Sequence, residues 1–131
     1  EVVMPRLKSD LLELFDGIAT GTLSERDVQI DPRTATTVMM VSGGYPEDYE
    51  KGKVIKGLNA IDDSIVFHSG TNVENGLVKT NGGRVVAVTS YGKDIETALK
   101  KSYDSAAKIQ YENCYFRKDL GLDLIKKNKK G

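Results

Sequence analysis

Residues 84–91 read Arg84-Val85-Val86-Ala87-Val88-Thr89-Ser90-Tyr91, and this run decides the fold. Its β-branched residues favour an extended backbone, so we expect it to form the longest strand. Residues 36–42 are rich in Thr, Val and Met and predict a second, largely buried strand. Shorter strands are expected at residues 64–68, 71–73, 77–80 and 114–117.

Tight turns connect these strands. Asn75-Gly76 is the strongest hairpin signal in the chain, because this dipeptide suits the backbone of a two-residue β-turn. Asn81-Gly82-Gly83 predicts another tight turn, directly before the longest strand. The strands should therefore pair mainly in an antiparallel way.

Two helices are expected. Asp10 is a suitable N-cap for a helix at residues 10–20, with Glu13 three residues further on. Asp94 caps the second and better helix, whose small and apolar residues recur at i, i+3 and i+4. Additional helical turns are expected at residues 24–27 and 121–125.

Hairpin-linked strands and one long packed helix predict an α+β fold with a mainly antiparallel sheet. The helix at residues 10–20 stands apart from this pattern. We therefore expect residues 1–22 to be the end of a preceding domain and residues 23–131 to form the α+β domain. The chain begins without Met, which also favours a piece of a longer protein.

Composition narrows the function classes. The chain has 131 residues, and its nineteen basic and nineteen acidic residues give zero net charge, which argues against a nucleic-acid partner. No apolar run approaches the ~18 residues of a membrane span, so no membrane partner is expected. The single cysteine, Cys114, cannot form an internal disulfide and favours a reducing, cytoplasmic location.

Glycine-rich turns carry the candidate binding residues. Glycine lets a ligand approach the backbone closely, and successive main-chain amides form anion-binding nests. The candidates in these turns are Ser42, Gly43, Gly44, Tyr45, Pro46, Lys51, Asn81, Gly82 and Gly83. Arg84 adds a planar fork of donors suited to phosphate or carboxylate. On this chemistry alone, a ligand site and a set of purely structural turns are both open.

The turn after residues 64–68 adds three possible site residues, His68, Gly70 and Thr71. His68 is the only histidine and has no cysteine near it in the sequence, so no metal site is expected. A hydrogen-bonded structural histidine at a strand end is the favoured interpretation.

The order of these motifs resembles the C-terminal part of the phosphoribosylamine–glycine ligases, a family of the ATP-grasp superfamily. The matching stretches are Pro5-Arg6-Leu7-Lys8-Ser9-Asp10-Leu11, Ser42-Gly43-Gly44-Tyr45-Pro46 with Lys51-Gly52, Phe67-His68-Ser69-Gly70-Thr71, Thr80-Asn81-Gly82-Gly83-Arg84-Val85-Val86-Ala87-Val88-Thr89 and Tyr115-Phe116-Arg117-Lys118-Asp119-Leu120-Gly121. Glu47 and Ala87 depart mildly from the family pattern.

The resemblance implies an enzyme of purine synthesis that joins glycine to 5-phosphoribosylamine through a glycyl phosphate, with ATP converted to ADP and phosphate. It implies that Arg84, with the amides after Asn81, is the catalytic group near the substrate anions. Ser9 and Asp10 would lie near the glycine pocket, and residues 42–46 would line the substrate cleft. Residues 1–22 would be the end of the ATP-grasp core.

The same resemblance implies that ATP and magnesium bind upstream of this chain. The sequence contains no segment for the nucleotide-clamping lysines or for the magnesium-binding Glu and Asn. We therefore expect no cofactor on this chain alone, no ligase activity without the N-terminal domains, and no metal site. A stand-alone domain that binds a phosphorylated metabolite and a purely structural or oligomerisation domain are the alternative functions.

Overall fold

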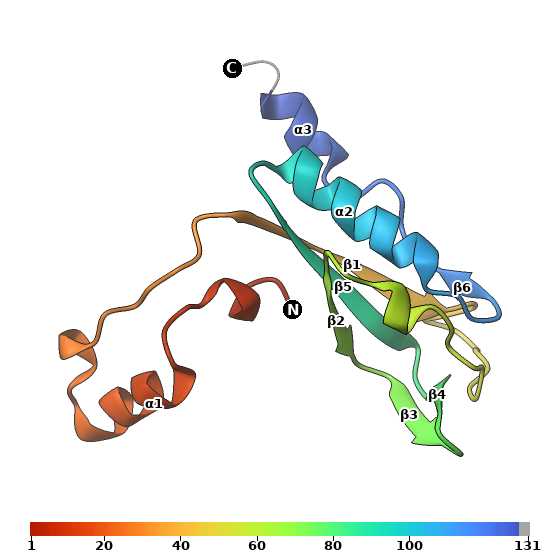
Figure 1. The fold of residues 1–131 in the computed structure, drawn as a ribbon, viewed down its shortest axis with the longest axis horizontal. Helices are drawn as coiled ribbons and strands as arrows, with labels where there is room; N and C mark the ends of the chain where they lie inside the picture. Colours follow the sequence, from red (N-terminus) through yellow and green to blue (C-terminus); the bar gives the residue numbers. More distant parts are fainter. Residues whose placement is uncertain (129–131) are drawn as a thin grey trace.

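The computed structural model describes residues 1–128 and contains a main sheet with a long helix along it and a separate two-stranded hairpin (Figure 1). In chain order the elements are the short 3-10 turns and helices η1 (Met4–Arg6), α1 (Leu11–Thr20) and η2 (Leu23–Glu25), then β1 (Thr34–Ser42), η3 (Leu58–Ala60), β2 (Ile65–His68), β3 (Thr71–Glu74), β4 (Leu77–Thr80), β5 (Arg84–Gly92), α2 (Ile95–Lys108), β6 (Cys114–Tyr115) and α3 (Leu122–Asn128). Among these residues, no helix has both the length and the apolar character that crossing a bilayer requires.

The main sheet has four strands in the order β2-β5-β1-β6, and every neighbouring pair is antiparallel. β3 and β4 form a separate two-stranded hairpin around the predicted Asn75-Gly76 turn. The α+β class and the mainly antiparallel pairing are thus confirmed. The strand predicted at residues 114–117 is shorter than expected, because Phe116 leaves the sheet and stacks on Tyr103 of α2, with ring centroids 6.3 Å apart.

β1 and β5 are the two longest strands and pair along their length, with Thr34 opposite Gly92. A β-bulge interrupts the register, because Met40 lies opposite Val86 whereas Val41 lies opposite Arg84. Val85 is the extra residue, and both it and Val86 contribute to the same core. Bulges bend a strand and redirect neighbouring side chains, here immediately next to Arg84.

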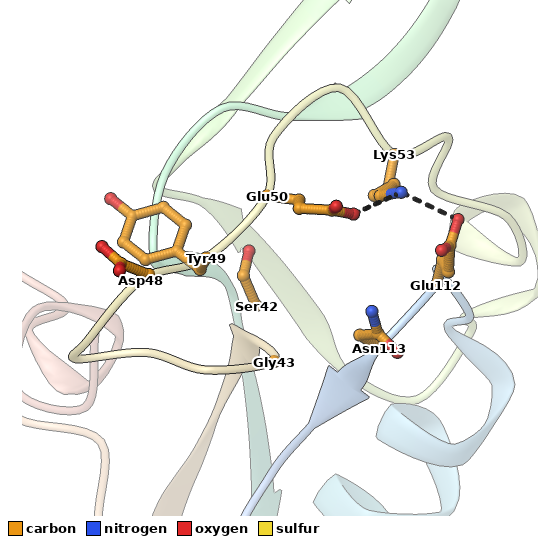
Figure 2. A pocket seen from close by; sticks show the side chains of 8 residues that line it. All are labelled: Ser42, Gly43, Asp48, Tyr49, Glu50, Lys53, Glu112 and Asn113. Carbon is orange, nitrogen blue, oxygen red and sulfur yellow. Dashed lines mark hydrogen bonds and ion pairs between the residues drawn. The ribbon is translucent and has the colours of Figure 1, made fainter.

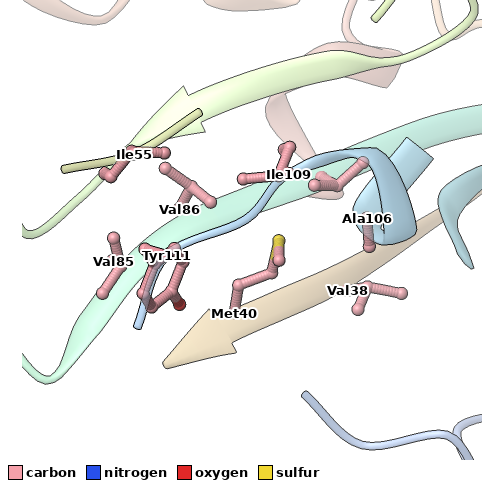
Figure 3. Close-up of a cluster of buried hydrophobic side chains, with 9 residues drawn as sticks. Val38, Met40, Ile55, Val85, Val86, Ala106, Ile109 and Tyr111 are labelled. Atoms are coloured by element: carbon pink, nitrogen blue, oxygen red, sulfur yellow. The ribbon is translucent and has the colours of Figure 1, made fainter. Parts of the chain in front are cut away.

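The core lies between α2 and one face of the sheet (Figure 3). Its buried members are Val38, Met40, Ile55, Val85, Val86, Val88, Ala106, Ile109 and Tyr111. Val38 and Met40 alternate with less buried neighbours along β1, as expected for a strand with one face on the core. The predicted inward face of the second helix is confirmed at Ala98, Leu99, Ser102 and Ala106.

A chain of buried hydroxyl groups joins α2 to the sheet. Ser102 of α2 is within 2.9 Å of Thr36 of β1 and 2.9 Å of Ser90 of β5. Ser64 continues the chain, at 2.7 Å from Ser90 and 2.7 Å from Ser105. Small side chains let the helix approach the strands closely, and mutual hydrogen bonds remove the cost of burying their oxygens.

The N-terminal segment extends away from the sheet (Figure 1). Its helix α1 confirms the predicted helix: Asp10 accepts a hydrogen bond from the amide of Leu12 at 2.8 Å, and Gly21 ends the helix with φ of 72°. The strand-like segments on either side of α1 meet, since the amide of Asp31 donates to the carbonyl of Arg6 at 2.7 Å.

The hydroxyl chain generates a stability prediction. Ser102→Ala should lower the free energy of unfolding by about 1–3 kcal/mol, because the buried Thr36 hydroxyl loses its side-chain partner. Urea unfolding followed by circular dichroism measures the change. Ala107→Ser, on the exposed side of the same helix, is the matched control and should shift stability by less than about 0.5 kcal/mol. Equal effects of the two variants would show that the chain of hydroxyl groups contributes nothing to the free energy of unfolding.

Candidate functional site

Strand direction brings the glycine-rich turns together. β1 and β2 are both antiparallel to β5, so both finish at the end of the sheet where β5 begins. The turns after Ser42 and His68 therefore meet the turn that precedes Arg84. We call residues 42–46, 68–71 and 81–84 the turn cluster.

Hydrogen bonds join the three turns directly. The amide of Ser42 donates to the carbonyl of Gly83 at 2.8 Å, and the Ser42 hydroxyl donates to the carbonyl of Gly82 at 3.0 Å. The amide of Asn81 donates to the carbonyl of Gly70 at 2.7 Å. The Ser42 side chain is only 3% exposed, so its hydroxyl holds two turns together.

Two glycines allow this close approach. A β-carbon at Gly70 would lie 2.4 Å from the carbonyl oxygen of Arg84, a distance that real β-carbons do not reach. A β-carbon at Gly83 would lie 1.9 Å from the ring of Tyr45, which packs over this glycine. Tyr45 also contacts Tyr49 edge-on, with ring centroids 5.9 Å apart.

The turn cluster presents main-chain donors. Within residues 1–128, the amides of Gly82 and Gly83 donate no hydrogen bond to another protein group. They directly precede Arg84, an exposed residue whose side chain has neither an ion pair nor a hydrogen bond with the described residues. Adjacent free amides beside a guanidinium are donors of the kind that bind phosphate or carboxylate oxygens.

Lys51 supplies a second cation next to the cluster. The amide of Gly52 donates to the carbonyl of Thr80 at 2.6 Å, which holds the adjoining Lys51 near the turn before β5. Lys51 is exposed and has no ion pair with the described residues, whereas nearby Lys53 is paired. Lys51 and Arg84 can therefore both offer their charge to a ligand.

A cavity of about 210 Å³ lies beside the cluster (Figure 2). It is lined by Ser42, Gly43, Asp48, Tyr49, Glu50, Lys53, Glu112 and Asn113. Lys53 is 2.7 Å from Glu50 and 3.0 Å from Glu112, and the hydrogen bond from Lys53 lowers the pKa of the Glu50 carboxyl. The carboxylates outnumber the single lysine, so this cavity is a poorer site for phosphate than the glycine amides next to it.

Sequence reasoning missed Glu112 and Asn113. They precede β6, whose Cys114 pairs with Ser42, and this pairing carries them to the cluster. A β-carbon at Gly43 would lie 2.7 Å from Asn113, so these segments touch. The only sequence signal was the expected strand after residue 113, which by itself does not say which strand it joins.

The possible site residues at the end of β2 and just after it also lie in the cluster. Nδ1 of His68 is 2.9 Å from the Thr71 hydroxyl, and both side chains are accessible to solvent. This hydrogen bond fits the structural histidine that the sequence favoured. Among residues 1–128, no group of His, Cys, Asp or Glu side chains is arranged to hold a metal ion.

Ser9 and Asp10 do not join the cluster. The Ser9 hydroxyl donates to the carbonyl of Asp27 at 2.9 Å and accepts from the amide of Gln29 at 2.7 Å. Asp10 caps α1, which lies away from the edge that carries the turns (Figure 1). A role for these two residues at the glycine pocket stays a prediction.

Cys114 lies at the same end of the sheet, but its surroundings do not activate its thiol as a nucleophile. Burial raises the pKa of its thiol, which keeps the thiol protonated near neutral pH. The nearby Tyr111 hydroxyl donates to the carbonyl of Val41 at 2.9 Å and fixes the end of β1.

Comparison with known proteins gives concordant matches. The family described as phosphoribosylglycinamide synthetase, C domain, matches residues 35–123. Phosphoribosylamine–glycine ligase from Pseudomonas aeruginosa is 40% identical over 125 residues, which are 94% of this chain and 29% of that protein. The enzyme of the same name from Escherichia coli O157:H7 is 40% identical over 128 residues, 95% of this chain and 30% of its own length.

A solved structure agrees with the sequence matches. The crystal structure of phosphoribosylamine–glycine ligase from Thermotoga maritima superimposes with a TM-score of 0.64 at 28% identity, over 82% of this chain and 27% of that chain. All these matches fall in one class, the ligases or synthetases, and this chain spans less than a third of each of the three named proteins. The chain belongs to the phosphoribosylglycinamide synthetase C-domain family.

The contact between Tyr45 and Gly83 generates a prediction about the turn cluster. Gly83→Ala should destabilise the protein by about 1–3 kcal/mol, because its new methyl group overlaps the Tyr45 ring. In a Tyr45→Ala background the same substitution should cost much less, since all the nearest atoms belong to that ring. A double-mutant cycle of urea unfolding energies measures the coupling, and additive effects would contradict the packing described.

Proposed function

We propose that this chain is the C-terminal segment of a ligase that joins glycine to 5-phosphoribosylamine while ATP is converted to ADP and phosphate. The observation that carries the proposal is the turn cluster, where the exposed Arg84 directly follows Gly82 and Gly83, whose amides donate no hydrogen bond within residues 1–128. The family membership and the names of the relatives support this assignment.

In the proposed reaction, transfer of a phosphoryl group to the glycine carboxylate gives glycyl phosphate. The amine of phosphoribosylamine attacks the acyl carbon, a C–N bond forms, the C–O bond to phosphate breaks, and the amine loses a proton. Negative charge on phosphate oxygens persists through both steps, so positioned cations and amides lower the barrier. We assign Arg84 the catalytic contact to these oxygens, or to the ribose phosphate.

The other predicted residues take supporting roles. We assign Lys51, Asn81, Gly82 and Gly83 to binding the same anion, and the turn at residues 42–46 to the wall of the substrate cleft. Ser42 and Tyr45 support this wall through their contacts with the turn before β5. His68, Gly70 and Thr71 border the same turn and are candidates for a weaker contact.

We infer that the nucleotide and magnesium bind to domains that precede this chain in the complete protein. Those domains, with glycine and phosphoribosylamine, are its expected partners. We place the complete enzyme in the cytoplasm, where purine precursors are made, with no nucleic-acid or membrane partner.

The proposed domain boundary puts residues 1–22 at the end of the ATP-grasp core. Helix α1 supports this assignment, because its apolar side chains Leu12, Phe15 and Ile18 are 76%, 55% and 61% exposed. A helix whose apolar face is exposed needs cover from a neighbouring domain. The family match begins only at residue 35, beyond this helix.

Arg84 provides the direct test of the function. In the complete protein, Arg84→Ala should lower kcat/KM by the equivalent of about 2–4 kcal/mol, since a charged contact made in a water-poor site is lost. Steady-state formation of ADP with glycine and phosphoribosylamine measures the effect. Arg84→Lys should recover part of it, and Lys100→Ala on α2 is the control. An unchanged kcat/KM in Arg84→Ala would remove Arg84 from the site.

The isolated chain provides a second test. Residues 1–131 alone should form no ADP from ATP, glycine and phosphoribosylamine, because the proposed nucleotide site lies elsewhere. A coupled ADP assay with the complete protein as the positive control measures this. Glycine-dependent ADP formation by the isolated chain would overturn the assignment of the nucleotide site to preceding domains.

A further inference from the structure

The direction in which Arg84 points depends on its main chain. Its side chain is exposed and has no ion pair or hydrogen bond with the described residues that would hold it. Arg84 directly follows Gly82 and Gly83, and glycine has the greatest freedom about its main-chain angles. Two adjacent glycines would leave the guanidinium free to point in many directions unless another part of the protein holds their peptide groups.

Ser42 holds both of these peptide groups. It is the last residue of β1 (Figure 2). Its hydroxyl donates to the carbonyl of Gly82 at 3.0 Å, and its amide donates to the carbonyl of Gly83 at 2.8 Å. The first carbonyl belongs to the peptide group that joins Gly82 to Gly83, and the second belongs to the group that joins Gly83 to Arg84. One residue therefore fixes the two peptide planes before Arg84.

Holding these carbonyls also sets the direction of the amides. Among residues 1–128 the one cis peptide bond joins Tyr45 to Pro46, so the two bonds before Arg84 are trans. In a planar trans peptide group, the carbonyl and the N–H point in opposite directions. Because the carbonyl of Gly82 points at the Ser42 hydroxyl, the amide of Gly83 is turned away from Ser42. It is one of the two amides that are free to bind an anion.

Ser42 is itself held in place. It is only 3% exposed, and it pairs with Cys114 of β6. The preceding carbonyl, that of Val41, accepts a hydrogen bond from the Tyr111 hydroxyl at 2.9 Å. The residue that holds the glycines is thus part of a strand end that is fixed from a second side.

We propose that Ser42 is a positioning residue, which orients the Gly83 amide and Arg84 towards one bound anion. The proposal rests on the proposed function in taking that anion to be a phosphate group of the ligase reaction. The Ser42 hydroxyl is buried and donates to the carbonyl of Gly82. Ser42 therefore acts through the turn and does not contact the substrate.

Kinetics of the complete protein test this role. Ser42→Ala should lower kcat for ADP formation roughly tenfold and leave KM for ATP and glycine within about twofold, because a misplaced group that acts in the transition state slows the chemical step. Ser42→Cys keeps the side chain's shape but is a weak donor, so it should also lower kcat. Ser105→Ala is the matched control, since it removes another buried serine hydroxyl, on α2, and should leave kcat unchanged.

Coupling to Arg84 separates positioning from a general loss of stability. In an Arg84→Ala background, Ser42→Ala should change kcat by less than about twofold, since the main group that it orients is gone. Additive effects of the two substitutions would overturn the proposal. So would an unchanged kcat in both folded Ser42 variants, or equal losses in Ser42→Ala and Ser105→Ala; urea unfolding shows which variants are folded.

Hydrogen exchange of the complete protein gives a readout that does not need ligase activity. The amides of residue 42 and Asn81 donate to the carbonyls of Gly83 and Gly70, so their exchange reports on the contacts between the turns. Both should exchange about fivefold faster in Ser42→Ala than in the wild type or in Ser105→Ala. Unchanged exchange would overturn the proposal. Faster exchange in a protein that forms no ADP would refute the proposed function and leave Ser42 as the residue that orients the turn.

Discussion

The antiparallel pairing of β1 with β5 is the constraint on which the rest of the structure depends. It places the end of β1 against the start of β5, and β2 follows the same rule on the other side of β5. Three turns that are far apart in the sequence thereby share one edge. The bulge at Val85 then fits two adjacent valines into the core immediately after the strand begins at Arg84.

Much of the fold follows from local sequence. The strands, the Asn75-Gly76 hairpin and the Asp10 and Asp94 caps were all predicted, because turn chemistry, capping and periodicity act over a few residues. The short extent of β6 was not predicted, since it depends on the distant contact between Phe116 and Tyr103.

The candidate site was less accessible to sequence reasoning. The glycine-rich turns could be recognised one by one, but their meeting depends on strand order, which no local pattern specifies. Glu112 and Asn113 reach the cavity only because β6 pairs with the end of β1. Similarly, Ser42 looked like a ligand contact, yet its buried hydroxyl binds the carbonyl of Gly82 and holds the turns together.

The seam between α2 and the sheet has a consequence for how the domain responds to its surroundings. Its polar contacts join the hydroxyls of Thr36, Ser90 and Ser102 and continue to Ser64 and Ser105, and Ser102 also donates to the carbonyl of Thr36. Hydroxyls do not titrate in the physiological range, and neutral hydrogen bonds are not screened by salt as ion pairs are. The packing of α2 on the sheet is therefore unchanged when pH or ionic strength changes. The ion pairs of Lys53 and Lys79 weaken or exchange under the same changes.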